Sequence, residues 1–219
     1  MPRLPREARQ GKAHAMRVVA GRFGGRRLRP PPDAGVRPTS ERVREALFAQ
    51  LGVLEDARVL DLYAGTGALG IEALSRGAAQ ATFVERSAAS LAVLRDNLGR
   101  LGLEPQSRVM RGDALALVRR LGRSTERFDL VLADPPYALE VGPAVLAALA
   151  AAEIVALGGT VVIESARRHP VRPVPGWRVV SERRYGDTVV TRLTEEPGGG
   201  RGMQGEWPGS TPDGGEAEE

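Results

Sequence analysis

Four consecutive residues, Asp134, Pro135, Pro136 and Tyr137, have the clearest capacity for chemistry in this sequence. Two adjacent prolines fix φ and withhold N–H groups, so the carbonyl groups of Asp134 and Pro135 are presented on a rigid turn. An exocyclic amino group on a nucleobase is a poor nucleophile, because its lone pair is delocalised into the ring. The Asp134 carboxylate and the Pro135 carbonyl could accept its two hydrogens, while Tyr137 offers a face on which the base stacks. The alternative is a proline turn that only ends a strand.

A glycine-rich stretch lies about seventy residues earlier and follows a short apolar run. Gly65, Gly67 and Gly70 match the G-x-G-x-x-G pattern of dinucleotide sites, and Glu85 lies twenty residues beyond Gly65. That pattern alone is weak evidence for NAD. Asp61 distinguishes between NAD and S-adenosylmethionine as the cofactor. The pyrophosphate of NAD is negatively charged and binds backbone N–H groups, so a carboxylate beside it would be unfavourable. A carboxylate there suits the ammonium group of S-adenosylmethionine better, although it could instead brace the loop.

Further carboxylates follow the neighbouring strands. Glu85 would accept hydrogen bonds from both ribose hydroxyls of the cofactor. Asp113 could accept the adenine amino group, cap the following helix, or do both. The predicted cofactor contacts are Asp61, Tyr63, Gly65, Gly67, Glu85, Asp113 and Ala114.

Strand-like and helix-like segments alternate from residue 58 and would position both loops. Continuous apolar runs indicate strands buried on both faces of a parallel sheet. Residues 177–183 and 188–193 alternate in polarity, which predicts an antiparallel hairpin at the sheet edge. The other predicted strands are 59–63, 81–84, 108–110, 128–133 and 160–164, and the helices after the first glycine loop are 68–76, 87–100, 115–121 and 140–152. The predicted fold class is α/β: a Rossmann-like, doubly wound, mostly parallel seven-stranded sheet with a C-terminal antiparallel hairpin and a small N-terminal hairpin and helix.

The composition limits the class of protein. A chain of 219 residues with 42% hydrophobic content can bury the core of one sizeable domain. No apolar run approaches the roughly 18 to 20 residues that span a bilayer, and no export signal is evident. The sequence has no cysteine, which excludes disulfides and thiolate metal sites and agrees with a cytoplasmic location. His14 and His169 have no partner at ligand spacing, so we expect no metal.

Charge is distributed unevenly along the chain. Residues 1–44 carry twelve Arg or Lys against three Asp or Glu, whereas residues 195–219 carry seven acids and one arginine. A basic arm suits the phosphate backbone of a nucleic acid. The predicted RNA-binding residues are Arg17, Arg22, Arg26, Arg27, Arg37, Thr39 and Arg42. We divide the chain into a flexible leader (1–15), a basic hairpin and helix (16–52), an α/β domain that carries both loops (53–194) and a disordered acidic tail (195–219), with Met1 or Met16 as the start. The family resemblance given below implies that 16–52 is an RNA-binding extension and 53–194 a methyltransferase domain. Removal of residues 1–36 should then weaken RNA binding and spare the cofactor site.

The combination of motifs resembles one bacterial family. Asp61 to Gly67 followed by Asp134 to Tyr137 is similar to Class I S-adenosylmethionine-dependent amino-methyltransferases. The runs 16–21 and 70–78, with Arg37 to Thr39, narrow the resemblance to the RsmD family over about residues 16–194. That resemblance implies methylation of guanine N2 in 16S ribosomal RNA, with the small-subunit particle as the expected partner. It also implies that Asp134 is the catalytic acceptor and Tyr137 the stacking residue.

Three other functions fit parts of the sequence. A DNA adenine-N6 methyltransferase shares the loop chemistry but usually carries a sizeable target-recognition domain. An NAD-dependent oxidoreductase leaves Asp61 and the proline loop unexplained. A non-catalytic RNA-binding module explains the arginines and neither loop.

Overall fold

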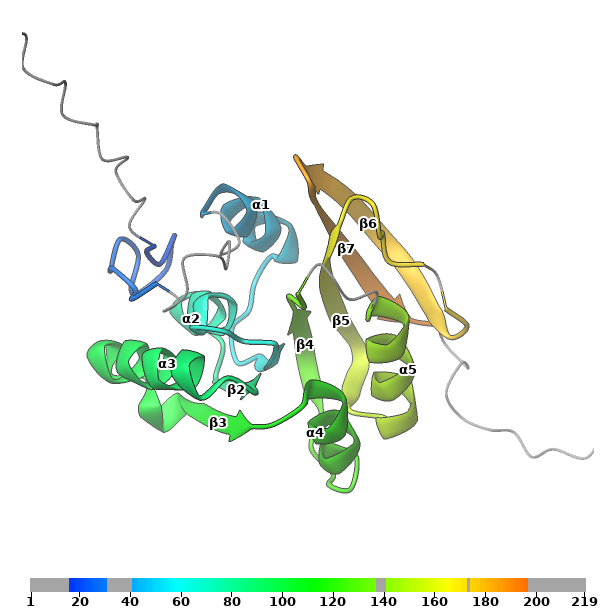
Figure 1. The fold of residues 1–219 in the computed structure, drawn as a ribbon, viewed down its shortest axis with the longest axis horizontal. Helices are drawn as coiled ribbons and strands as arrows, with labels where there is room; N and C mark the ends of the chain where they lie inside the picture. Colours follow the sequence, from blue (N-terminus) through cyan, green and yellow to red (C-terminus); the bar gives the residue numbers. More distant parts are fainter. Residues whose placement is uncertain (1–15, 31–40, 137–140, 173, 197–219) are drawn as a thin grey trace, which may run out of the picture.

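The computed structural model describes residues 16–30, 41–136, 141–172 and 174–196, and these form an α/β fold around a seven-stranded sheet (Figure 1). The strand order is β3-β2-β1-β4-β5-β7-β6. The strands are β1 (Arg58–Leu62), β2 (Gln80–Glu85), β3 (Ser107–Arg111), β4 (Phe128–Ala133), β5 (Val155–Ala166), β6 (Trp177–Tyr185) and β7 (Thr188–Glu195). The helices are α1 (Glu41–Leu51), α2 (Ala68–Ser75), α3 (Ala88–Leu101), α4 (Ala114–Leu121) and α5 (Gly142–Ala152), with a 3-10 turn, η1 (Glu104–Gln106).

The first five strands are parallel, and the chain reverses direction only at its end. β1 lies between β2 and β4, while β7 runs antiparallel between β5 and β6. Gly186, with φ of 63°, allows the tight turn that joins β6 to β7. The predicted fold class, including the C-terminal antiparallel hairpin, is confirmed.

Helices cover both faces of the sheet (Figure 1). Apolar side chains of α1, α2 and α3 pack on one face, and those of α4 and α5 pack on the other. Four of the five residues of β1 and five of the six of β4 are buried, which is why most residues of these strands are apolar. None of the helices in the described ranges is long and apolar enough to cross a bilayer.

β5 is longer than the sequence predicted, because it begins at Val155 rather than Thr160. Gly158 has φ of 77°, and the pairing of β4 with β5 shifts register between Phe128 and Leu130. Gly158 and Gly159 are residue types common in turns, but here they lie at an irregularity within the strand. β7 likewise includes Glu195, since that residue pairs with Trp177. Predictions about residues 1–15 and 197–219 lie outside the described residues.

The segment 16–30 is attached to the main body by buried polar groups. Arg17 and Arg27 form one antiparallel bridge, and the chain turns between them. Glu72 of α2 is fully buried and accepts the backbone N–H groups of Val19 (2.7 Å) and Ala20 (3.0 Å). Met16, Val18 and Leu28 belong to the same apolar core as α1, α2 and α3. The segment is therefore part of the domain's packing.

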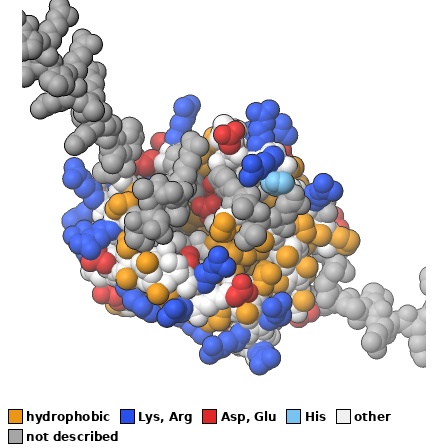
Figure 2. Space-filling view, in the orientation of Figure 1, with side chains coloured by type: hydrophobic (Ala, Val, Ile, Leu, Met, Phe, Trp, Pro, Cys, Tyr) orange, Lys and Arg blue, Asp and Glu red, His pale blue; other side chains and the backbone are white. Residues whose placement is uncertain are grey.

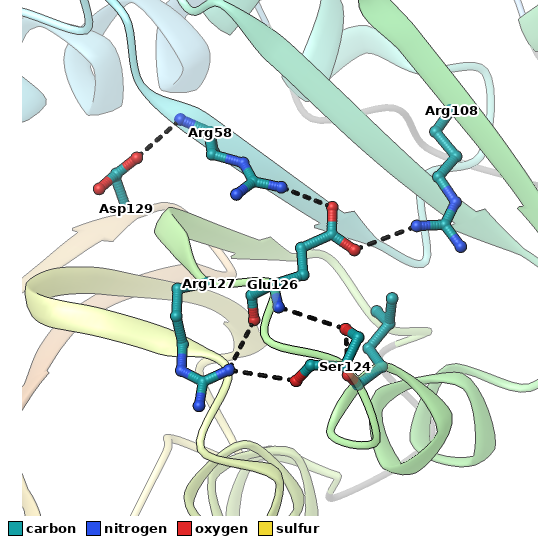
Figure 3. Close-up of polar contacts among 7 residues, drawn as sticks. Arg58, Arg108, Ser124, Glu126, Arg127 and Asp129 are labelled. Atoms are coloured by element: carbon teal, nitrogen blue, oxygen red, sulfur yellow. Dashed lines mark hydrogen bonds and ion pairs between the residues drawn. The ribbon is translucent and has the colours of Figure 1, made fainter.

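An ion-pair network connects the amino ends of the parallel strands (Figure 3). Glu126 accepts from Arg58 of β1 at 2.8 Å and from Arg108 of β3 at 3.0 Å. Asp129 accepts the backbone N–H of Arg58 at 2.8 Å. These contacts join three strands and leave the opposite edge, at the carboxyl ends, for the loops that carry the predicted site.

Candidate functional site

The glycine loop after β1 has a backbone shape that few residues adopt. Tyr63, Gly65 and Gly67 all have positive φ, of 59°, 55° and 85°. A Cβ on Gly67 would lie 2.2 Å from Leu94 Cδ1, so only glycine fits there. A Cβ on Gly65 would meet no heavy atom of the described residues closer than 4.0 Å, which leaves its outer side open to a ligand. The two glycines thus have different roles, one in packing and one in access.

Asp61 lies under this loop and is almost fully buried. Its Oδ2 accepts the Gly70 N–H at 2.9 Å, whereas its Oδ1 is buried without a hydrogen-bond partner among the described residues. Burial raises the pKa of Asp61 to about 7; the Gly70 N–H opposes this shift and the Glu85 charge adds to it. Asp61 therefore stabilises the loop through its Oδ2, as one of the two predicted roles requires. Its Oδ1 is still available to accept a hydrogen bond from a cationic group. The site fits the ammonium group of the predicted cofactor.

Glu85, at the end of β2, holds two loops together. Its Oε2 accepts the Gly65 N–H at 2.9 Å and its Oε1 accepts the Ser87 N–H at 2.7 Å. Each carboxylate oxygen has a second lone pair, so these bonds leave acceptor capacity for the ribose hydroxyls. Glu85 is half-buried and thus partly open to a ligand.

Asp113 follows β3 and caps α4. Its Oδ1 accepts the Ala116 N–H at 2.9 Å, and the rest of the side chain is exposed. Burial raises the pKa of Tyr63, the Asp113 charge raises it further and Arg86 opposes the rise, which places these groups in one neighbourhood. Ala114 is buried beneath them. The predicted cofactor residues after β1, β2 and β3 thus share the carboxyl edge of the sheet.

Asp134 lies beside this group because β4 pairs with β1. Leu62 and Ala133 are register partners, and the Asp134 N–H donates to Leu62 O at 3.4 Å. Asp134 is half-buried, Pro135 is buried and Pro136 is exposed. Tyr137, the predicted stacking residue, lies outside the described residues. The structure therefore brings the Asp134 turn against the glycine loop, as two neighbouring strand ends require.

The predicted RNA-binding arginines of the segment 16–30 are exposed. Arg17 pairs with Glu41 at 3.0 Å, while Arg22 donates to Gln106 at 3.1 Å and covers the Phe23 ring. Arg26, Arg27 and Arg42 are also exposed. The other two residues predicted to bind RNA, Arg37 and Thr39, lie outside the described residues.

Sequence reasoning missed one buried side chain that connects this segment to the glycine loop. Asn97 of α3 accepts the Arg29 N–H at 2.7 Å and donates to Arg29 O at 3.3 Å and to Thr66 O at 3.1 Å. Thr66 lies between the two loop glycines. Because of these bonds, residues 16–29 cannot be removed without exposing polar groups beside the loop. These contacts argue against the expectation that deletion of residues 1–36 spares the cofactor site, which stays a prediction.

The described residues include no cluster of side chains suited to a metal ion. Within the described ranges, no group of three or more His, Cys, Asp or Glu side chains is arranged to hold a metal ion. His169 lies beyond β5, and His14 is outside the described residues.

Comparison with known proteins connects this geometry to a family. The family model described as Conserved hypothetical protein 95 matches residues 16–194. Ribosomal RNA small subunit methyltransferase D of Escherichia coli (strain K12) is 42% identical over 123 residues, which are 56% of this chain and 60% of that protein. The protein of the same name from Haemophilus influenzae is 30% identical over 173 residues, which are 78% of this chain and 89% of that protein.

A solved structure supports the same connection. A hypothetical protein of Thermus thermophilus superposes with a TM-score of 0.71 at 31% sequence identity. The superposition covers 83% of this chain and 100% of that chain. The strand order and the loops at the carboxyl edge therefore belong to a shared architecture.

The raised pKa of Asp61 predicts a pH-dependent affinity for the cofactor product S-adenosylhomocysteine, which keeps the ammonium group. Binding of this cation favours ionised Asp61, so affinity should rise about tenfold between pH 6 and pH 8, with proton release. Calorimetric titration in buffers of different ionisation enthalpy measures both quantities. In the protein alone the sign is opposite: stability should fall from about pH 4 to about pH 7, because the native state retains a proton that the unfolded state loses.

Asp61→Asn should bind the product more weakly and lose this pH dependence, whereas Asp129→Asn at the opposite edge should behave like the wild type. A wild-type affinity that does not change between pH 6 and pH 8 would show that Asp61 does not face the cation.

Replacing Asn97 with alanine should damage both stability and the cofactor loop. Two part-buried backbone groups of Arg29 and the buried Thr66 carbonyl would lose their partner, which should lower the free energy of unfolding by about 1 to 3 kcal/mol. Affinity for S-adenosylhomocysteine should fall about tenfold, because Thr66 would no longer be held. Urea unfolding and calorimetric titration are the measurements.

Gln106→Ala is the matched control, since Gln106 binds Arg22 of the same segment and lies away from the loop. It should leave cofactor affinity unchanged. Equal losses of affinity in the two variants would mean that Asn97 acts only through general stability.

Proposed function

We propose a function from the premise that this chain belongs to the family described as Conserved hypothetical protein 95, the RsmD family of S-adenosylmethionine-dependent methyltransferases. The resemblance found in the sequence motifs is thereby confirmed, and S-adenosyl-L-methionine is the cofactor. We infer that the chain methylates small-subunit ribosomal RNA, as the names of its relatives state for those proteins. We further infer that the acceptor is the exocyclic N2 amino group of a guanine.

The observation that carries the proposal is the placement of Asp134 and Pro135 against the glycine loop. The pairing of Leu62 with Ala133 sets the turn at the end of β4 next to the loop that follows β1. A nucleobase amino group bound at that turn would lie close to the cofactor loop. A positioned pair of reactants can remove about 7 kcal/mol or more from a barrier without a covalent enzyme intermediate.

The protein's contribution to the reaction is to orient and activate a weak nucleophile. S-adenosyl-L-methionine, when bound, supplies the methyl group. The Asp134 carboxylate and the Pro135 carbonyl accept the two amino hydrogens, which localises the nitrogen lone pair. The nitrogen becomes acidic only after it gains the methyl group, so Asp134 can take up its proton without a raised pKa.

The remaining carboxylates of the site hold the cofactor. Asp61 Oδ1 is placed to accept the ammonium group, and the free lone pairs of Glu85 suit the ribose hydroxyls. Asp113, already bonded to Ala116, has an exposed oxygen for the adenine amino group. Each of these three carboxylates would thus bind the cofactor while it keeps its hydrogen bond to a backbone N–H group.

The decisive experiment is transfer of a radiolabelled methyl group from S-adenosylmethionine to small-subunit particles that lack their modifications. Nucleoside analysis of the extracted RNA should recover the label as N2-methylguanosine. DNA offered in the same reaction tests the adenine-N6 alternative. Label in adenine or only in DNA would overturn the proposed substrate, and no transfer to any acceptor would overturn the proposed activity.

Asp134→Ala should lower turnover at least about 100-fold and leave cofactor affinity within about twofold of the wild type. The reason is that Asp134 acts on the amino group, whereas the cofactor contacts come from β1, β2 and β3. Single-turnover methyl transfer and calorimetric titration give the two quantities.

The control is Asp129→Ala on the same strand, since Asp129 lies at the opposite edge of the sheet and is exposed. It should retain wild-type turnover. Full transfer activity in Asp134→Ala would refute the assigned role of the carboxylate.

A further inference from the structure

A cavity opens next to the Asp134 turn on the side of β5. Pro135 and Pro136 form one wall, residues 163–166 at the end of β5 form a second, and residues 168–172 form a third. The first turn of α5 completes the lining. Since β4 separates β1 from β5 in the sheet, the catalytic turn has the cofactor loop on one side and this cavity on the other. An acceptor that reaches Asp134 from the β5 side must pass this cavity.

The cavity has a basic rim. Arg168 and Arg172 line it and are exposed, with His169 between them in the chain. Glu164, the single acidic residue among the described residues that line the cavity, is buried at the end of β5. The exposed guanidinium groups thus place positive charge at the solvent side of the cavity, where it attracts an anion.

Two neutral features also favour an anion. The Oγ of Ser165, a lining residue, is buried without a hydrogen-bond partner in the part of the chain that the structure describes. The first turn of α5 has no side-chain cap, and Gly142 and Pro143 of that turn line the cavity. An unpartnered hydroxyl is a donor for a phosphate oxygen, and the positive end of a helix favours an anion even though Pro143 itself has no N–H to donate.

We propose that this cavity is a phosphate subsite that binds a phosphodiester group of the RNA beside the target nucleotide. Arg168 and Arg172 bind the phosphate oxygens, and Ser165 and the first turn of α5 supply neutral donors. The inference rests on the proposed action on RNA and adds a residue set that the cofactor site and the basic segment 16–30 do not include.

The position of the subsite explains why it would matter for the reaction. A base that is methylated on its amino group must leave its stack, which costs a few kcal/mol. A phosphate held beside Pro135 fixes the backbone next to the displaced base and limits where that base can go. Figure 2 shows arginine side chains at several places around the margin of this face, with some acidic side chains among them and apolar side chains between. RNA held by its backbone at such a margin can direct one base inward.

The first test is the binding of unmodified small-subunit ribosomal RNA by Arg168→Ala/Arg172→Ala. The variant should bind about tenfold more weakly near 0.1 M salt, and the slope of log affinity against log salt should become shallower by about one. Affinity for S-adenosylhomocysteine should stay within about twofold of the wild type, which also checks the fold.

Arg119→Ala/Arg123→Ala removes the same charge from exposed positions in and after α4 and is the matched control. It should change RNA affinity less than about threefold. The proposal is overturned if the two double variants lose the same affinity, or if Arg168→Ala/Arg172→Ala retains the wild-type salt slope.

The second test locates the phosphate. A short RNA containing the methylated guanine is made with a neutral methylphosphonate at each flanking linkage in turn. At one linkage, the methylphosphonate should weaken RNA binding by the wild type about tenfold. The same substitution should change RNA binding by Arg168→Ala/Arg172→Ala less than about threefold, because this variant already lacks the arginines that contact the phosphate. Equal effects on both proteins at every linkage would overturn the subsite.

The outcomes separate this inference from the proposed function. If no methyl group reaches ribosomal RNA, the proposed function fails, and the salt slopes still decide whether the arginines bind RNA. If methyl transfer occurs but the two double variants behave alike, the function stands and the subsite fails. Ser165→Ala, with a smaller loss of RNA affinity of about threefold, tests the neutral donor separately.

Discussion

Hydrogen bonds from backbone N–H groups to carboxylates are the interaction on which the site depends. Asp61 accepts from Gly70, and Glu85 accepts from Gly65 and from the start of the next helix. Such charge-assisted bonds are stronger than neutral ones. They fix the shape of a loop whose residues include glycines with no side chain to pack. The same carboxylates then present their remaining lone pairs at the carboxyl edge, so the structural and the chemical roles lie in the same atoms.

The sequence predicted most of the sheet because its central strands are buried on both faces. Continuous apolar runs marked β1 and β4, and the loops that follow them contain the residues with chemical capacity. Parallel strands place their carboxyl ends at one edge, so the proximity of Asp61 and Asp134 followed from fold class alone. The first part of β5 was missed, because Gly158 and Gly159 are typical of a turn and the strand accommodates them through a register shift.

The contacts made by Glu72 and Asn97 could not be predicted in the same way. Glu72 is the one charged residue of an apolar helix, and Asn97 lies among leucines on an amphipathic one, but the pattern does not say what either side chain contacts. Their partners are backbone atoms of distant segments, which have no side-chain signature. Hydrophobic periodicity reports which face of a helix is buried, but it does not report which buried polar groups meet there.

The attachment of the first described residues also sets an order for folding during synthesis. The Val19 N–H donates to the Glu72 carboxylate, 53 residues later in the chain, and the Arg29 N–H donates to the Asn97 amide oxygen, 68 residues later. Neither bond can form before its acceptor has been synthesised. The nascent chain therefore cannot settle this basic stretch until α3 has left the ribosome. β7 lies between β5 and β6, so the far side of the sheet closes only when nearly the whole chain has been made. Residues 19–29 thus complete their contacts well after they are translated.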